Sequence, residues 1–140
     1  MNRRTLPSFA FVTPNNVDNG HDSGSGVPAL DRFLSKFVSM VQLTNAYQEG
    51  TVAMFITVDE GSGGTQGQDC TNVSLDLAGK QESCHVPFFV LDPYTKPGPV
   101  SGFFDHYSVT RTVEELFKLP LLAGAANAPS LVTPFGLVAA

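Results

Sequence analysis

The chain has 140 residues and a mass of 14.9 kDa, and 42% of its residues are hydrophobic while 15% are charged. Eight Lys and Arg residues against 13 Asp and Glu residues give a net charge of −5, which makes a poor electrostatic partner for nucleic acid. The low charged fraction excludes a solvated tail, no apolar run approaches the roughly 20 residues that span a bilayer, and the length suits one domain at most.

The first predicted element is a short buried strand over residues 8–12, which are apolar. Arg3 and Arg4 precede this run, as basic residues do in a signal peptide. The apolar stretch is too short for a signal peptide, however, and Pro7 interrupts it. We therefore predict no targeting signal in the chain as given. Residues 15–26 lack apolar periodicity and contain three glycines, which predicts a loop.

The next predicted element is an amphipathic helix. Apolar residues fall at i, i+3, i+4, i+7, i+8 and i+11, starting at Leu30 and ending at Val41, which is the stripe of a half-buried helix. Pro28 suits the first turn of this helix, and Gly50 suits its far end.

Residues 51–58 form a nearly unbroken apolar run rich in β-branched residues, which predicts a strand buried on both faces, as in a parallel sheet. A long polar loop over residues 61–85 follows and contains Cys70 and Cys84. These cysteines form either a disulfide or two free thiols; closing a loop of this length would be worth about 3 kcal/mol. A zinc site would need two more soft ligands, and only His85 lies near in sequence.

Residues 86–91 predict a second buried strand, and residues 94–102 predict a loop. Asp105 can cap a helix that Pro120 ends. The inward face of this helix is predicted to consist of Val109, Val113, Leu116 and Phe117. The last twenty residues show weak periodicity and predict no element. The alternation of strands and helices predicts an α/β fold with a mostly parallel central sheet flanked by helices.

Polar side chains follow the ends of the predicted strands, where ligands bind in open α/β sheets. These side chains are His21 and Asp22, Asp59 and Glu60, and Asp105 and His106. Adjacent carboxylates favour Mg, Ca or Mn as a bound ion, and a histidine nitrogen widens the choice to Zn or Fe. The alternatives are structural: a polar loop around His21, a solvated strand end at Asp59, and a plain helix cap at Asp105.

Several short motifs, in order and at matching spacing, resemble the phosphoesterase family. This family includes bacterial acid phosphatases and phosphatidylinositol-3-phosphatase-like secreted proteins, and it is related to phospholipase C and the alkaline phosphatase superfamily. The matching stretches are residues 6–15, 19–22, 55–61, 84–98 and 104–117.

The resemblance implies an enzyme that hydrolyses phosphate monoesters with a divalent metal ion, acting on a small phosphate ester or a phosphoinositide. It places the metal on Asp59 and Glu60, with Asp22 as a further candidate ligand, and it places His21 and His106 against the phosphate. It also implies a disulfide between Cys70 and Cys84 and an extracellular or periplasmic location. Phosphodiester hydrolysis of the phospholipase C type is an alternative.

The resemblance is confined to the C-terminal half of the family's domain. Family members carry a nucleophilic Ser or Thr and a further metal-binding segment in their N-terminal half, and neither has a counterpart in this chain. We therefore expect residues 1–140 to be one C-terminal part of an alkaline-phosphatase-like domain, with an incomplete sheet. The alternative function is a non-catalytic remnant or binding module, which would associate through exposed sheet edges.

Overall fold

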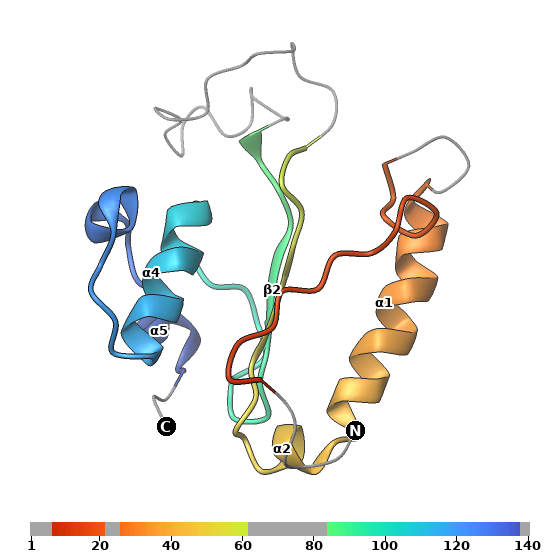
Figure 1. Cartoon of the computed structure of the whole chain (residues 1–140), viewed down its shortest axis with the longest axis horizontal. Helices are drawn as coiled ribbons and strands as arrows, with labels where there is room; N and C mark the ends of the chain where they lie inside the picture. Colours follow the sequence, from red (N-terminus) through yellow and green to blue (C-terminus); the bar gives the residue numbers. More distant parts are fainter. Residues whose placement is uncertain (1–6, 22–25, 62–83, 138–140) are drawn as a thin grey trace. The chain divides into compact units, whose positions relative to one another are not determined.

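A computed structural model describes residues 7–21, 26–61 and 84–137 of the chain (Figure 1). The elements in chain order are α1 (Gly26–Gln42), α2 (Asn45–Gln48), β1 (Met54–Thr57), β2 (Phe88–Leu91), α4 (His106–Leu116), the 3-10 helix η2 (Ala123–Asn127) and α5 (Val132–Phe135). The chain divides into two compact units, Met1–Val52 and Ala53–Ala140. Within the three described ranges, no helix is both long and apolar enough to cross a membrane.

The first unit confirms the predicted amphipathic helix. Helix α1 contains the whole apolar stripe and has Pro28 in its first turn. Two residues of the stripe, Phe33 and Phe37, stack with their ring centroids 5.8 Å apart. The helix ends at Gln42 rather than near Gly50, because the Thr44 side chain accepts a hydrogen bond from the Tyr47 amide and starts the short helix α2. Gly50, with φ of 72°, follows α2 instead.

The predicted strand over residues 8–12 is wrong. These residues form no strand, and the side chains of Phe9 and Phe11 are 54% and 85% exposed. An apolar run becomes a buried strand only where another strand pairs with it, which the run itself cannot specify. The loop that follows is confirmed as far as residue 21, and it is ordered by Asn15, whose side-chain oxygen accepts from the amides of Val17 and Asp18.

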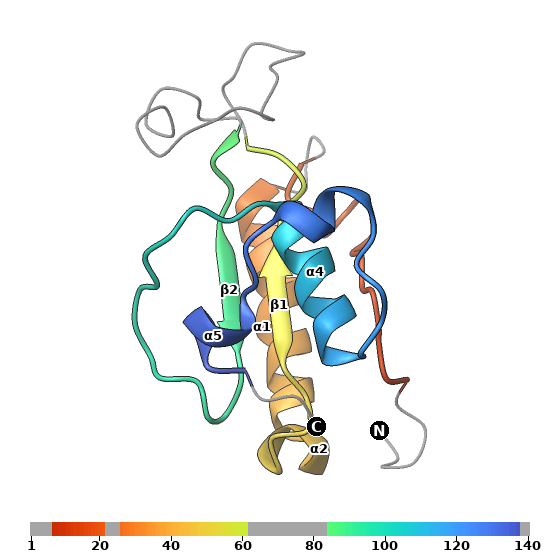
Figure 2. The ribbon, with the colours of Figure 1, turned by 90° about the vertical axis from the view of Figure 1, so that its left-hand side faces the viewer.

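The second unit contains a two-stranded sheet in which β1 and β2 lie side by side (Figure 2). Both strands were expected from their apolar runs, but they pair antiparallel, with Met54 opposite Leu91 and Thr57 opposite Phe88. The prediction of parallel pairing is therefore wrong for these two strands: a continuous apolar run is typical of parallel sheets but does not by itself determine strand direction. The strands are half-buried rather than buried on both faces.

Four phenylalanines connect the sheet to the C-terminal part of the second unit. The ring of Phe55 stacks on Phe88, with centroids 6.1 Å apart, and Phe88 meets Phe135 edge-on at 5.9 Å. Phe104 lies 6.0 Å from the same Phe135 ring. The Thr95 hydroxyl also donates to the Phe135 carbonyl. Helix α5 therefore contacts both the sheet and the loop that follows β2.

Helix α4 begins as predicted, at the Asp105 cap. The Asp105 side chain accepts from the Ser108 amide at 2.9 Å, and the Ser108 hydroxyl lies 3.2 Å from the Asp105 amide, which completes a capping box. The helix ends at Leu116, four residues before Pro120. Both ends of the predicted helix are therefore confirmed to within a few residues.

The predicted inward face of α4 is wrong. Its buried residues are Ser108, Thr112 and Glu114, whereas the predicted apolar residues are half-buried or, in the case of Phe117, exposed. The Thr112 hydroxyl donates to the Ser108 carbonyl at 2.7 Å and accepts from the Leu131 amide at 2.9 Å. Polar side chains can be buried here because each has a hydrogen-bond partner: Asp105 for Ser108, and main-chain amides of the C-terminal segment for Thr112 and Glu114.

The segment over residues 121–137, for which the sequence predicted no element, packs on α4. Ala125, Ala128 and Leu131 are buried and form the centre of this contact. The guanidinium of Arg111 donates to the carbonyls of Ala126 and Ala128, at 3.2 and 2.8 Å. Main-chain carbonyls can be supplied by almost any sequence, which is why periodicity alone did not place this segment.

Glu115 gives this contact a dependence on pH. A hydrogen bond from Ser130 and another from Arg111 hold the pKa of the Glu115 carboxyl below its ordinary value of about 4.5. A carboxyl whose pKa is lowered by folding stabilises the folded state at pH values above its ordinary pKa. This stabilisation is lost as the pH falls through the pKa that the group has in the folded protein. We expect the free energy of unfolding to decrease below about pH 4.5 and to decrease less steeply in Glu115→Gln. Urea unfolding at a series of pH values measures the free energy of unfolding of both proteins. If this free energy fell equally steeply with pH in the wild type and in the variant, the prediction would be wrong.

Gly124 lets η2 approach the ring of Tyr107 closely. A Cβ atom at Gly124 would lie 2.7 Å from Cε1 of that ring, which is too close for real atoms. We expect Gly124→Ala to lower the free energy of unfolding by about 1–3 kcal/mol, because the ring must move. In a Tyr107→Ala background the same substitution should be nearly neutral, and urea unfolding of the four variants measures the coupling.

Candidate functional site

The candidate site lies where β1 ends. Asp59 and Glu60 follow the strand directly, and both side chains are exposed. The Thr57 hydroxyl donates to the Pro87 carbonyl at 2.9 Å, which joins the end of β1 to the residue before β2. The two carboxylates are therefore accessible to a ligand, on a strand end whose position is held by a cross-strand hydrogen bond.

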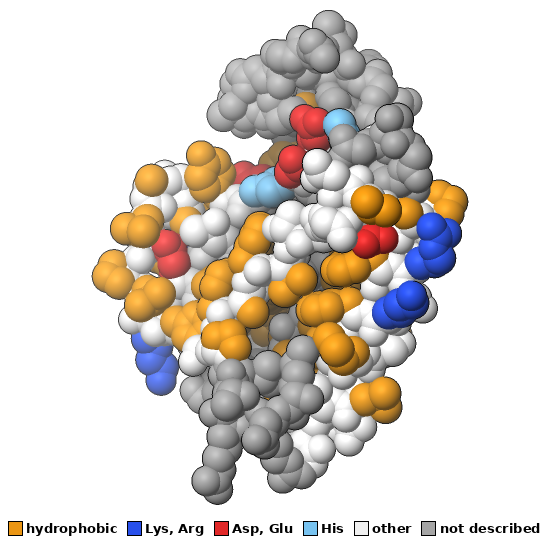
Figure 3. All heavy atoms as spheres, turned by 45° about the vertical axis from the view of Figure 1, so that its right-hand side comes forward, with side chains coloured by type: hydrophobic (Ala, Val, Ile, Leu, Met, Phe, Trp, Pro, Cys, Tyr) orange, Lys and Arg blue, Asp and Glu red, His pale blue; other side chains and the backbone are white. Residues whose placement is uncertain are grey.

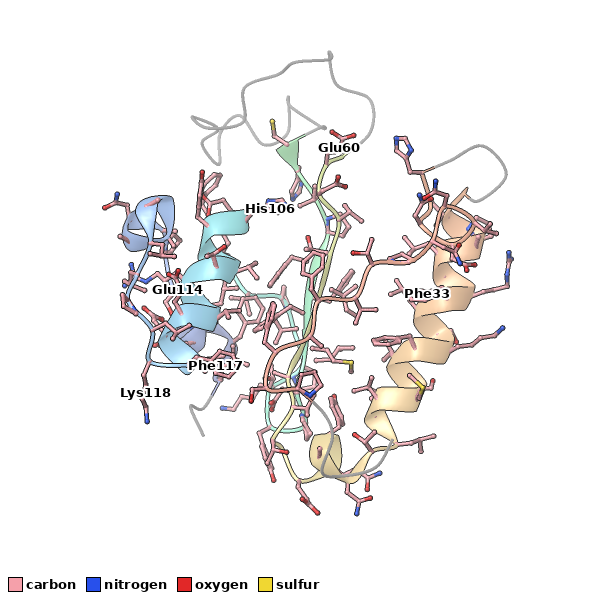
Figure 4. All side chains as sticks on the ribbon, in the orientation of Figure 1. Phe33, Glu60, His106, Glu114, Phe117 and Lys118 are labelled. Atoms are coloured by element: carbon pink, nitrogen blue, oxygen red, sulfur yellow. The ribbon has the colours of Figure 1, made fainter. Side chains whose placement is uncertain are left out.

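His106 comes to the same strand end from a distant part of the sequence. Its Nε2 atom lies 3.2 Å from the Val58 carbonyl oxygen, although 48 positions separate the two residues. His106 is the first residue of α4, so the Asp105 cap fixes the main chain that carries it. Figure 4 shows Glu60 and His106 at one end of the second unit, whereas Phe117 and Lys118 lie at the opposite end of α4.

The site is rich in groups that carry negative charge or lone pairs. Asp59 and Glu60 precede the loop after β1, Asp105 caps α4, and His106 lies between these two places. Figure 3 shows that acidic and histidine side chains are exposed on the molecular surface. Carboxylate oxygens and imidazole nitrogens are the donor types that divalent cations prefer.

The donor types thus suit a divalent cation, but the described residues do not complete a site. Within residues 7–21, 26–61 and 84–137, no group of three or more His, Cys, Asp or Glu side chains is close enough to hold a metal ion. A structural zinc site usually has four protein ligands and a catalytic zinc site three, whereas Mg²⁺ is often held by one or two carboxylates.

The structure does not test the other residues predicted for the site. His21 lies in the first unit, is exposed, and its amide donates to the Asn19 side chain at 2.9 Å. Asp22 and Cys70 lie outside the described residues, as does most of the predicted loop over residues 61–85. The phosphate contact of His21, the metal contact of Asp22 and the pairing of Cys70 with Cys84 stay predictions.

The structure adds two groups that the sequence did not suggest. The Val58 carbonyl contacts His106, and the Thr57 hydroxyl lies within 3.2 Å of that same carbonyl as well as bonding to Pro87. Val58 takes part through its main chain, so its side chain gives no signal in the sequence. Thr57 has the pattern of an ordinary strand residue, and a threonine two positions before a pair of acids is too common to point to a site.

Comparison with known proteins places the chain among phosphoesterases. The profile of the Phosphoesterase family matches residues 1–120. Phosphatidylinositol-3-phosphatase of Mycobacterium tuberculosis is 26% identical over 133 residues, which cover 94% of this chain and 37% of that protein. A probable acid phosphatase of Kluyveromyces lactis is 28% identical over 130 residues, which cover 91% of this chain and 27% of that protein. The chain thus spans about a third of the length of these relatives, and no solved structure matches it.

Proposed function

The chain belongs to the Phosphoesterase family, and on this premise we propose that it contributes to the hydrolysis of phosphate monoesters through Asp59, Glu60 and His106. The observation that carries this proposal is the contact of His106 with the Val58 carbonyl, which brings the histidine to the strand end that holds both acids. The relatives are named as phosphatases, which supports phosphate-ester hydrolysis as the chemistry.

The three residues have chemistry that suits phosphoryl transfer. A transferred phosphoryl group carries negative charge on its equatorial oxygens, and a histidine can bind these oxygens or move a proton at the reacting oxygen. His106 is exposed, so a substrate phosphate can reach its ring. Carboxylates repel a bare phosphate, so Asp59 and Glu60 are better suited to hold a cation or to accept a proton than to bind the substrate directly.

Dependence on a divalent cation is a separate part of the proposal. Asp59 and Glu60 would hold the ion, and no third His, Cys, Asp or Glu side chain joins them among the described residues. Asp22 is the candidate that the resemblance suggests. A bound cation would neutralise charge on the phosphoryl oxygens. Mg, Ca, Mn, Zn and Fe all remain compatible with oxygen and nitrogen donors.

The substrate class follows from the names of the relatives. One is named a phosphatidylinositol-3-phosphatase and the other a probable acid phosphatase, so a phosphoinositide and a small phosphate monoester are both proposed substrates. We further propose an extracellular or periplasmic location, with Cys70 and Cys84 joined as a disulfide. Disulfides persist in oxidising compartments, so the two parts of this proposal support each other.

Hydrolysis of p-nitrophenyl phosphate tests the proposed reaction. We expect the purified chain to release p-nitrophenol from this monoester faster than from bis(p-nitrophenyl) phosphate. We also expect a chelator to abolish turnover and an added divalent cation to restore it. Faster cleavage of the diester would favour the phospholipase C type of reaction instead. The proposal is wrong if the rate with the chain equals the rate with its His106→Ala variant.

A second candidate function is binding without turnover, and the open edges that the two-stranded sheet has among the described residues favour it. A binding module would bind inorganic phosphate through the same residues without turnover. Within the described part of the chain, each strand of the sheet has a single partner, so its outer edges could pair with another chain. Titration calorimetry and size-exclusion chromatography distinguish these outcomes.

A further inference from the structure

The hydrogen bond between His106 and Val58 determines where the ring carries its proton. A main-chain carbonyl oxygen can only accept a hydrogen bond, so the Nε2 atom that lies 3.2 Å from it must carry the hydrogen. A neutral imidazole has one N–H group, and its other nitrogen then has a free lone pair. In His106 this second nitrogen is Nδ1.

We propose that the Val58 carbonyl holds His106 in the Nε2-protonated tautomer, and that Nδ1 is the nitrogen with which His106 meets the phosphate ligand. The second half of this statement rests on the proposed function. When Nδ1 takes a proton from a phosphate hydroxyl or a water, the electron pair of the broken O–H bond stays on the oxygen. The ring becomes a cation whose Nε2–H still faces the carbonyl, so the carbonyl stabilises both forms.

The two partners are each held by other parts of the second unit. On one side, β1 pairs with β2 through Thr57 opposite Phe88, and the Thr57 hydroxyl bonds to Pro87. On the other side, the capping box at Asp105 fixes the first turn of α4. Thr57 is therefore a positioning residue, which acts on His106 through the carbonyl of the next residue.

The nitrogen-15 spectrum of the histidine rings tests the tautomer. The signals of His106 are identified by their loss in His106→Gln, and the spectrum is recorded at alkaline pH, where an ordinary imidazole is neutral. A peptide of residues 104–108 provides the reference for an unrestrained ring. We expect the ratio of Nε2-protonated to Nδ1-protonated ring to be about fivefold higher in the protein, as a typical hydrogen bond produces. A ratio equal to that of the peptide, or lower, overturns the proposal.

Two substitutions of Thr57 test the positioning role. Thr57→Val keeps the shape of the side chain but removes the hydroxyl, and Thr57→Ser keeps the hydroxyl. We expect the tautomer ratio of His106 to fall toward that of the peptide in the valine variant and to be preserved in the serine variant. Equal ratios in both variants overturn the role of Thr57. Chemical shifts of the α4 amides show whether either variant has changed the fold.

Inorganic phosphate tests which nitrogen meets the ligand. We expect added phosphate to shift the Nδ1 signal of His106 more than the Nε2 signal, and the reverse pattern overturns the assignment. His106→Asn places an amide near the position of Nδ1, whereas His106→Gln reaches the position of Nε2. Phosphate affinity should therefore fall about tenfold more in the glutamine variant. None of these measurements requires turnover, so an inactive chain would count against the proposed hydrolysis and not against the tautomer.

Discussion

Replacing Asp59 with asparagine should lower the hydrolysis of p-nitrophenyl phosphate by about 10²- to 10⁴-fold, the usual contribution of a group that moves a proton or holds a cation in the reaction. Glu60→Gln should have an effect in the same range. Each substitution removes a negative charge and keeps the size of the side chain. The measured quantity is kcat/KM for the monoester at saturating divalent cation.

The folded structure should tolerate both changes. Asp59 and Glu60 are exposed, so we expect the free energy of unfolding to change by no more than about 0.5 kcal/mol. Asp31→Asn and Glu49→Gln are matched controls, because they make the same chemical changes at exposed positions of α1 and after α2. A loss of rate in the controls as large as in the site variants would show that total charge matters and that the strand end does not.

Replacing Thr112 with valine should lower the free energy of unfolding by about 1–3 kcal/mol, the usual result of leaving a buried amide without its acceptor. The Thr112 side chain is fully buried, and its hydroxyl oxygen accepts from the Leu131 amide at 2.9 Å. Valine has nearly the same shape, so the change removes the hydrogen bond and creates almost no cavity. For a unit of this size, about 1 kcal/mol corresponds to a fall in Tm of roughly 4–8 °C.

Thr110→Val is the matched control on the same helix. Thr110 is exposed, and its hydroxyl donates to the His106 carbonyl one turn earlier at 3.3 Å. Both substitutions alter helix propensity equally, so the difference between their changes in Tm reports the contribution of the buried hydrogen bond. Circular dichroism during heating measures both. Equal changes in Tm would mean that Thr112 does not hold the C-terminal segment to α4.

Periodicity and caps predicted much of the local structure. The stripe from Leu30 to Val41 appears as α1, the apolar runs contain β1 and β2, and Asp105 caps α4. These features depend on side chains that are neighbours in sequence, which is why sequence reasoning finds them.

Features that depend on partners distant in sequence were not predicted. The strand expected at residues 8–12 has no strand paired with it among the described residues, and the direction in which β1 meets β2 is absent from their composition. The face of α4 was assigned by hydrophobicity, but Thr112 is buried because its hydroxyl accepts from the Leu131 amide of the distant C-terminal segment. A hydrophobic pattern cannot show that a polar residue will find a buried partner.

The residues of the candidate site were proposed from the sequence, but the contact between them was not. The rule that ligands bind beyond strand ends led to Asp59, Glu60 and His106, and the structure brings His106 to the strand that precedes the two acids. The contact that joins them runs through a main-chain oxygen, so spacing could not reveal it. His21 stays a prediction, because it lies in the other compact unit.

The use of a main-chain oxygen at position 58 also affects how the site can change by mutation. Every amino acid has a carbonyl group, so a library that varies position 58 alters the packing of a half-buried side chain but never deletes the acceptor that faces His106. Position 57 differs, since only a hydroxyl-bearing residue can bond to Pro87 as Thr57 does. Related sequences could therefore diverge at residue 58 and keep the same ring tautomer, and a search for shared side chains would overlook the contact.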